Sequence, residues 1–227
     1  MAERVRAPRR YYSPLRQEQA ATTRGAVLDA ARRLFLRDGY PATSMQAIAA
    51  AAGVAPKTVY LAFATKSGLM RALWDLALKG DEDDAAVDQR AWYREVIEEP
   101  DPEKQLRLNA RNARVVKVRI APLLEVIRNG APVDADVAAL WDLIHTDFYE
   151  NQRAIVEVIH RKRALQRGLD IATGTDILWT LNHPDVWQLL VGRRGWTPER
   201  WERWFADTAC AQLLKRPAAQ TLSRSAP

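Results

Sequence analysis

The 227-residue sequence predicts an all-α protein made of two helical modules. Apolar residues recur at three- and four-residue spacings, as at Val27, Ala31 and Leu34, which is the period of an amphipathic helix. No segment shows the apolar–polar alternation of a half-buried strand. Helix-start signals are frequent, because Asp101-Pro102-Glu103 and Thr197-Pro198-Glu199 each provide a capping oxygen, a proline at the first helical position and an acid in the first turn.

Composition and charge narrow the class of protein. With 48% hydrophobic residues the chain is able to bury a core, and no apolar run is long enough for a membrane span or a secretory signal, so we expect a cytoplasmic protein. Cys210 is the only cysteine, which excludes a disulfide within the chain and favours a small core residue. Residues 1–80 hold 13 Lys and Arg against 5 Asp and Glu, whereas residues 81–227 hold 21 against 23. This asymmetry indicates an N-terminal module that faces a polyanion, or a solvated basic face.

The segment 43–63 has the pattern of two short helices joined by a tight turn. Thr43 and Gln46 form a capping-box pattern for the first helix, and Gly53 suits the left-handed turn that ends it. Pro56 suits the first position of the second helix. Val59 and Phe63 lie four residues apart and are expected to face the core. The outer face is then left to Lys57, Thr58, Tyr60 and Leu61.

Residues on either side continue this register without a break over about 50 positions. This pattern of residues resembles that of the TetR family of bacterial transcriptional regulators. The matching residues are Ala30-Ala31, Leu34-Phe35, Gly39-Tyr40, Thr43-Ser44, Ile48-Ala49, Ala52-Gly53-Val54, Thr58-Val59-Tyr60, Phe63, Lys66 and Leu69.

The resemblance implies a three-helix helix-turn-helix head that binds DNA, a fourth helix that links it to a helical bundle for ligand binding and dimerisation, and a homodimer on a palindromic operator. By position, Ser44, Lys57, Thr58 and Tyr60 correspond to DNA-contacting residues of the family, and Lys66 to a lysine that meets phosphate. Two departures are Ala55, where a capping hydroxyl is usual, and the apolar pair Leu61-Ala62.

The rest of the chain reads as a helical bundle. A helix that begins at Asp101 is expected to kink or split at Pro122, and a long helix is expected from about Val133 to Lys162. Further helices are expected from about Thr175 to His183 and from about Pro198 to Leu214. The candidates for a dimer interface, or alternatively for the core of one subunit, are Leu189, Leu190, Trp201, Trp204 and Phe205.

We therefore expect four segments. They are a basic disordered arm over 1–15, a helix-turn-helix domain with its linking helix over 16–80, a helical regulatory and dimerisation domain over 81–216, and a disordered tail over 217–227. The arm carries Arg4, Arg6, Arg9 and Arg10, which either reach a minor groove or only solubilise the chain.

Two polar stripes suggest an effector pocket in the second domain. One holds Gln105, Asn109 and Asn112, and the other holds Trp141, His145, Phe148 and Gln152 at spacings of four, three and four. If these sides face the interior, they form an apolar wall with a few hydrogen-bonding groups, which suits an uncharged or weakly polar aromatic ligand. The alternative is that the polar groups pair with one another or face solvent. The candidate ligand-binding residues are Asn109, Asn112, Trp141, His145, Phe148 and Trp179.

Enzymatic chemistry has little support in the sequence. The three histidines lie far apart, and neither a metal-binding spacing nor a phosphate loop nor a nucleophile elbow occurs, so we expect no enzyme, cofactor or metal. The expected function is a ligand-responsive, sequence-specific DNA-binding regulator, most simply a repressor that a small molecule releases from its operator. The alternatives are a helical small-molecule-binding protein or enzyme without specific DNA binding, and a structural nucleoid protein.

Overall fold

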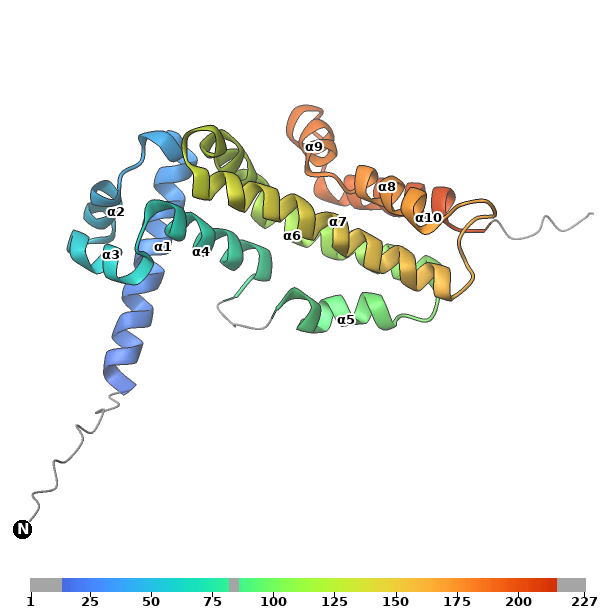
Figure 1. Cartoon of the computed structure of the whole chain (residues 1–227), viewed down its shortest axis with the longest axis horizontal. Helices are drawn as coiled ribbons and strands as arrows, with labels where there is room; N and C mark the ends of the chain where they lie inside the picture. Colours follow the sequence, from blue (N-terminus) through green and yellow to red (C-terminus); the bar gives the residue numbers. More distant parts are fainter. Residues whose placement is uncertain (1–13, 82–85, 216–227) are drawn as a thin grey trace, which may run out of the picture. The chain divides into compact units, whose positions relative to one another are not determined.

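The computed structural model describes residues 14–81 and 86–215, and these residues form helices throughout, apart from turns and one isolated antiparallel bridge between Leu165 and Leu214 (Figure 1). The expected all-α fold class is therefore confirmed. Arg4, Arg6, Arg9 and Arg10 lie outside the described residues, as does the segment 216–227. Among the described helices, none is long and apolar enough to cross a bilayer.

The chain divides into two compact units, residues 1–72 and 73–227. The first unit holds the helices before residue 72 and the beginning of the fourth. Its helices are α1 (Pro14–Ala42), α2 (Met45–Ala52), α3 (Pro56–Phe63) and the start of α4 (Lys66–Lys79). The last turns of α4 belong to the second unit, so one continuous helix has residues in both.

The core of the first unit is built from the apolar stripe of α1. Phe35 is fully buried and stacks on Tyr40 with ring centroids 5.6 Å apart. Gly39 takes φ +80°, a left-handed conformation that a side chain would strain, and this lets the chain turn before Tyr40. Ile48 and Leu69, both fully buried, belong to the same core.

The second unit is a bundle of longer helices joined by short turns. Its remaining elements are η1 (Val87–Gln89), α5 (Ala91–Glu98), α6 (Pro102–Gly130), η2 (Ala131–Val133), α7 (Ala135–Arg161), α8 (Ile171–Leu181), α9 (Pro184–Trp187), the π-helical segment η3 (Gln188–Arg193) and α10 (Pro198–Leu213). Both caps expected from the sequence are present. Asp101 accepts hydrogen bonds from the backbone of Glu103 and Lys104, and Thr197 accepts one from Arg200.

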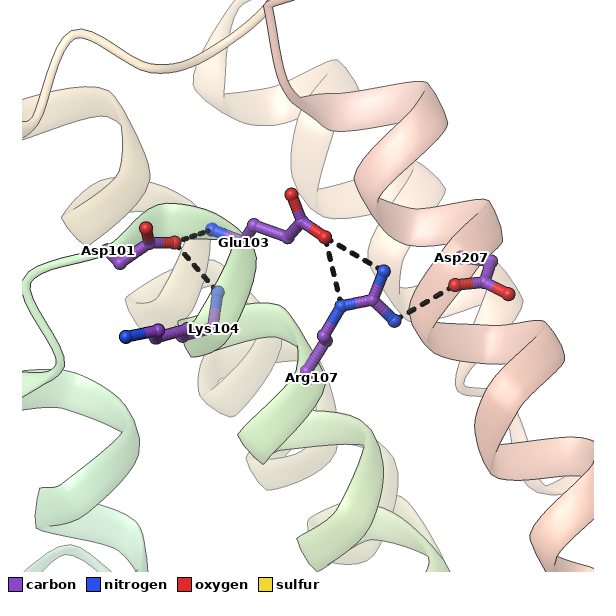
Figure 2. Close-up of polar contacts among 5 residues, drawn as sticks. All are labelled: Asp101, Glu103, Lys104, Arg107 and Asp207. Atoms are coloured by element: carbon purple, nitrogen blue, oxygen red, sulfur yellow. Dashed lines mark hydrogen bonds and ion pairs between the residues drawn. The ribbon is translucent and has the colours of Figure 1, made fainter.

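A charged contact joins α6 to α10. Arg107 donates to the Glu103 carboxylate one turn earlier and to Asp207 on α10, at 2.8 and 2.9 Å (Figure 2). The Glu103 and Asp207 carboxylates raise the pKa of Arg107 above its usual value, with Glu103 as the larger influence. Because the three side chains are about half exposed or more, the pairs fix the register of α6 against α10 more than they stabilise the fold.

The helix does not split at Pro122, which was one of the two expected outcomes, since α6 runs unbroken from Pro102 to Gly130. Proline removes the hydrogen bond that its nitrogen would donate to the carbonyl of Val118 four residues earlier. Pro122 and Val118 both lie on the exposed side of α6, where water is able to hydrate that carbonyl. The helix therefore continues past the proline.

Two of the residues considered for a dimer interface lie in the core instead. Trp201 and Phe205 are fully buried and stack with centroids 5.0 Å apart, and Trp187 meets Trp201 edge-on at 5.0 Å. The side chains of Trp201 and Phe205 are therefore not available to a second subunit. Leu189 is 51% exposed, and Leu190 and Trp204 are half-buried.

Candidate nucleic-acid interface and ligand cavity

The turn between α2 and α3 is set by one glycine and one proline. Gly53 has φ +69° and its N–H closes the end of α2 on the carbonyls of Ala49 and Ala50. Pro56 opens α3, and Ala55 before it makes no side-chain cap, as the sequence indicated. Val59 is fully buried and Phe63 is 7% exposed, so α3 packs on the unit through this side. These features give a helix-turn-helix with one free face on α3.

That free face carries most of the residues expected there. Lys57 is exposed, Tyr60 is 44% exposed and Leu61 is 79% exposed. Thr58 is only half-buried and lines a surface hollow between α1 and α3 together with Arg24 and Leu61. The Arg24 guanidinium lies 4.5 Å from the centroid of the Phe63 ring, which adds a cation on this side of the unit.

The capping of α2 differs by one residue from the expectation. Ser44, not Thr43, is the N-cap, and its hydroxyl accepts the N–H of Ala47 at 3.1 Å. Thr43 is buried, and its hydroxyl donates to the carbonyl of Gly39 at 2.8 Å. The left-handed turn at Gly39 brings that carbonyl within reach, so Thr43 closes the end of α1.

Lys66 is turned toward the protein backbone. Its ammonium donates to the carbonyls of Tyr40 and Thr43 at 2.9 and 3.1 Å and lies 4.1 Å from the centroid of the Tyr40 ring. These bonds hold the start of α4 against the junction of α1 and α2. Contact with a phosphate stays a prediction, and in this geometry it would have to share the ammonium with two carbonyls.

The second unit contains a cavity of about 140 Å³. An engineered apolar cavity of about 150 Å³ is known to hold a benzene molecule, so this space suits a small aromatic group. Its walls come from the last turns of α4, from η1 and α5, from α6 and α7, and from the residues around Pro184. Trp74, Leu78, Val96, Ile120, Phe148 and Ile155 make the walls largely apolar.

Several polar side chains in these walls are buried. Asn109 is 8% exposed and its amide nitrogen has no hydrogen-bond partner among the described residues. Asn182 is 4% exposed; its amide nitrogen donates to Gln152 at 3.1 Å, whereas its carbonyl oxygen has no partner in the described part of the chain. Asn112 donates to the carbonyl of Trp92 at 2.8 Å, which ties α6 to α5. Buried polar groups are usually paired, so these two atoms leave a donor and an acceptor unsatisfied in the cavity wall.

Lys117 is the one buried cation among the residues that line this cavity. It is 4% exposed, and the described residues offer it neither a hydrogen bond nor an ion pair. Its ammonium lies 5.2 Å from the Phe148 ring centroid and 5.4 Å from that of Trp201. Such ring contacts contribute about 0.5–2 kcal/mol, less than the several kcal/mol that burying an ammonium costs. Burial accordingly lowers the pKa of Lys117 from 10.5 to about 7.

Comparison with known proteins places the first unit in a family. Residues 27–73 match the family model described as bacterial regulatory proteins, tetR family. Over 61 residues the chain is 41% identical to the HTH-type transcriptional regulator AcrR of Shigella flexneri, covering 27% of this chain and 28% of that protein. The regulator UidR of Escherichia coli K12 matches at 37% over 57 residues, which are 25% of this chain and 29% of that protein. The first unit belongs to the TetR family.

The whole chain also has the TetR fold. NalD, the secondary repressor of the MexAB-OprM multidrug efflux pump in Pseudomonas aeruginosa, superposes with a TM-score of 0.65 at 20% identity, covering 86% of this chain and 98% of that one. A SmeT–triclosan complex superposes with a TM-score of 0.66 at 16% identity, covering 85% and 92%.

The sequence matches and the structural matches cover different parts of the chain. The sequence similarity spans less than a third of the curated relatives' length, so it rests on the DNA-binding head, while the structural similarity extends through the bundle. The curated relatives are regulators, which agrees with the expectation that the chain is not an enzyme.

The structure brings three of the six predicted ligand-binding residues to the cavity, namely Asn109, Asn112 and Phe148. Trp141, His145 and Trp179 do not line it. They form a separate aromatic cluster around His183, whose ring lies 4.7 Å from Trp179 and 6.0 Å from His145. His145 bonds the carbonyl of Trp141 at 2.9 Å. Burial lowers the pKa of His183, and its Nδ1 accepts the N–H of Asp185 as the cap of α9.

The sequence contains a signal for Lys117, because the α6 face that holds Asn109 continues beyond Asn112, where the predicted stripe stopped. Asn109, Ala113, Lys117 and Ile120 follow at spacings of four, four and three, which is one helix face. On α7 the face that lines the cavity runs through Ile144, Phe148 and Ile155. Trp141 shares that face one turn before the lining begins, and His145 falls on its edge.

Proposed function

We propose that this protein is a transcriptional regulator that binds duplex DNA through α3 and responds to a small molecule held in the cavity of its second unit. The observation that carries the proposal is the helix-turn-helix, in which α3 presents Lys57, Tyr60 and Leu61 outward in the part of the chain that matches the TetR family. A short helix with a cation and hydrogen-bonding groups near its N-terminus suits insertion into the major groove.

In this proposal Lys57 and Tyr60 contact the duplex from the free face of α3, and Thr58 contributes from the side that faces α1. Ser44 acts at the N-terminus of α2, where backbone N–H groups and the helix dipole favour a phosphate. Leu61 adds an apolar contact of the kind that reads a thymine methyl.

A homodimer on a palindromic operator completes the proposal. One head offers too small a surface for tight specific binding, and two heads placed about 34–36 Å apart read successive major grooves. NalD is named as a repressor and SmeT is named in complex with triclosan, so the neighbours support a repressor that a ligand releases.

The test begins with a randomised duplex library, from which the full chain selects its preferred sequence. Fluorescence anisotropy then compares the selected duplex with a scrambled one at several salt concentrations. We expect the selected duplex to bind at least about tenfold more tightly and both affinities to fall with salt. A protein that binds all duplexes alike is a nucleoid protein, and one that binds none in a salt-sensitive way is a small-molecule-binding protein without this function.

Substitution of the outward-facing residues of α3 then tests whether this helix contacts the DNA. The triple variant Lys57→Ala, Thr58→Ala and Tyr60→Ala should lose at least about tenfold in affinity for the selected duplex, because major-groove contacts contribute about 1–3 kcal/mol each. Lys104→Ala, which removes an exposed cation on α6, is the matched control. Unchanged affinity of the triple variant would exclude α3 as the reading helix.

A further inference from the structure

We infer that the cavity of the second unit takes an amphipathic organic anion, an aromatic or aliphatic carboxylate, whose acid group pairs with Lys117. This inference rests on the proposed function in that it names the chemical class of the effector. It replaces the uncharged ligand that the polar stripes alone suggested.

The first step of the argument is the isolation of Lys117. Its ammonium makes cation–ring contacts with Phe148 and Trp201, at 5.2 and 5.4 Å from the ring centroids, and no carboxylate of the described residues lies within ion-pair distance. A lysine buried to this degree is normally paired. A site that holds an unpaired ammonium in apolar walls is complete only when an anion enters it.

The second step is the composition of the walls. Trp74, Leu78, Ile120 and Phe148 offer contacts to a hydrocarbon body, not to a hydrated inorganic ion. The orphaned amide N–H of Asn109 is a donor, which also favours an acceptor group such as a carboxylate oxygen. An anion that carries a ring or a chain satisfies both the walls and the cation.

The third step concerns the other charged and titratable groups nearby. Tyr93 of α5 and Asp147 of α7 line the same cavity, His183 lies close enough to interact with Lys117, and Glu125 and Arg128 line a neighbouring hollow with it. Asp147 is exposed, so its carboxylate is hydrated and screened. Lys117 remains the buried charge that selects the ligand. Its lowered pKa also fits, because an anion that enters would draw a proton onto the amine.

The experiment uses two probes of the same shape, 2-naphthoate and its neutral amide 2-naphthamide, and calorimetry on the full chain without DNA. We expect naphthoate to bind at least about tenfold more tightly than the amide. Lys117→Met should remove this preference, while Lys104→Met, at an exposed position on the same helix, should keep it. Circular dichroism and thermal unfolding establish that each variant is folded.

A second measurement needs no variant. At pH 8 most of the Lys117 amine is neutral, so naphthoate binding should take up close to one proton, measured from the binding heat in buffers of different ionisation enthalpy, and naphthamide binding should take up none. Equal affinity for the two probes, no binding of either, or binding without proton uptake would overturn the inference. DNA binding is assayed separately, so its loss or retention judges the proposed function alone.

Discussion

Lys117 shows at the residue scale how a buried and unpaired charge affects stability. Its pKa is 10.5 in an exposed setting and about 7 in the fold, so between these values the unfolded chain holds a proton that the folded chain has lost. The free energy of unfolding therefore rises with pH through this window, because the burial penalty of the charged form is avoided as the amine deprotonates.

We predict that the difference in stability between the wild type and Lys117→Met shrinks from pH 7 to pH 9, with the variant more stable at pH 7 by about 1–4 kcal/mol. Urea unfolding followed by tryptophan fluorescence measures it, because seven of the eight tryptophans lie in residues 81–227. Tyr93 and Cys210 also titrate differently in the fold, but they do so in both proteins and cancel in the difference. His183 interacts with Lys117, but burial lowers its pKa below 6.5, so the imidazole stays neutral in both proteins from pH 7 to pH 9. Parallel pH curves would mean that Lys117 is not the titrating group.

Lys66 gives a second prediction at this scale. Its ammonium holds the carbonyls of Tyr40 and Thr43, so Lys66→Met should destabilise the first unit by about 1–3 kcal/mol in the absence of DNA. Lys57→Met, at an exposed position, should change stability by less than about 0.5 kcal/mol. Hydrogen exchange of the α1 and α4 amides separates the two variants. Equal protection in both would show that the two bonds contribute nothing.

At the scale of the element, the sequence predicted helices best where local chemistry decides. Gly53, Pro56 and the caps at Asp101 and Thr197 act on their own neighbours, and the structure has each of them in its expected role. Pro122 does not end the helix, because the effect of a proline depends on whether the carbonyl that loses its hydrogen bond is exposed to water. That exposure is a property of packing, which the local sequence does not give. The cap of α2 moved from Thr43 to Ser44 for a similar reason, since the turn at Gly39 claims the Thr43 hydroxyl.

The candidate cavity was predictable only in part, because it depends on how the helices are rotated in the bundle. The sequence identified Asn109, Asn112 and Phe148 as lining residues, but Trp141 and His145 from the same stripe as Phe148 lie outside the cavity wall. It did not show that Trp74 and Leu78 of α4 close the same space, since α4 is far away along the chain. Trp201 and Phe205 could not be assigned from sequence, because an aromatic stripe suits a core and an interface equally well.

The η3 segment carries a prediction about assembly. Leu189 is 51% exposed, whereas Trp201 is in the core, so Leu189→Arg should leave the fold intact and weaken the proposed dimer. Burying an arginine without a partner in an apolar interface costs several kcal/mol, which should shift the protein toward monomer at micromolar concentration. Sedimentation velocity measures the shift. Val133→Arg, at a 65% exposed position in η2, is the control. A dimer that persists in Leu189→Arg would place the interface elsewhere.

At the scale of the whole molecule, α4 is the element that connects the two proposed functions along the chain. It begins in the first unit with Lys66, and its last turns place Trp74 and Leu78 in the wall of the cavity. A ligand that contacts these two side chains acts on the same helix whose first residue is bonded to the head. If the ligand binds one arrangement of α4 better than another, it changes the population that is competent to bind DNA.

The prediction that follows is reciprocal coupling. If 2-naphthoate weakens binding of the selected duplex by some factor, then saturation with that duplex must weaken naphthoate binding by the same factor, because both describe one thermodynamic cycle. Typical couplings are about 5- to 150-fold. Anisotropy titrations of the duplex with and without naphthoate give one side, and calorimetry of naphthoate with and without the duplex gives the other. Leu78→Ala, which trims the α4 wall, should reduce both factors equally. Because the cycle makes the two factors equal, unequal factors would mean that the titrations had not reached equilibrium. A coupling factor that Leu78→Ala leaves unchanged, or no coupling at all, would mean that α4 has no part in the response.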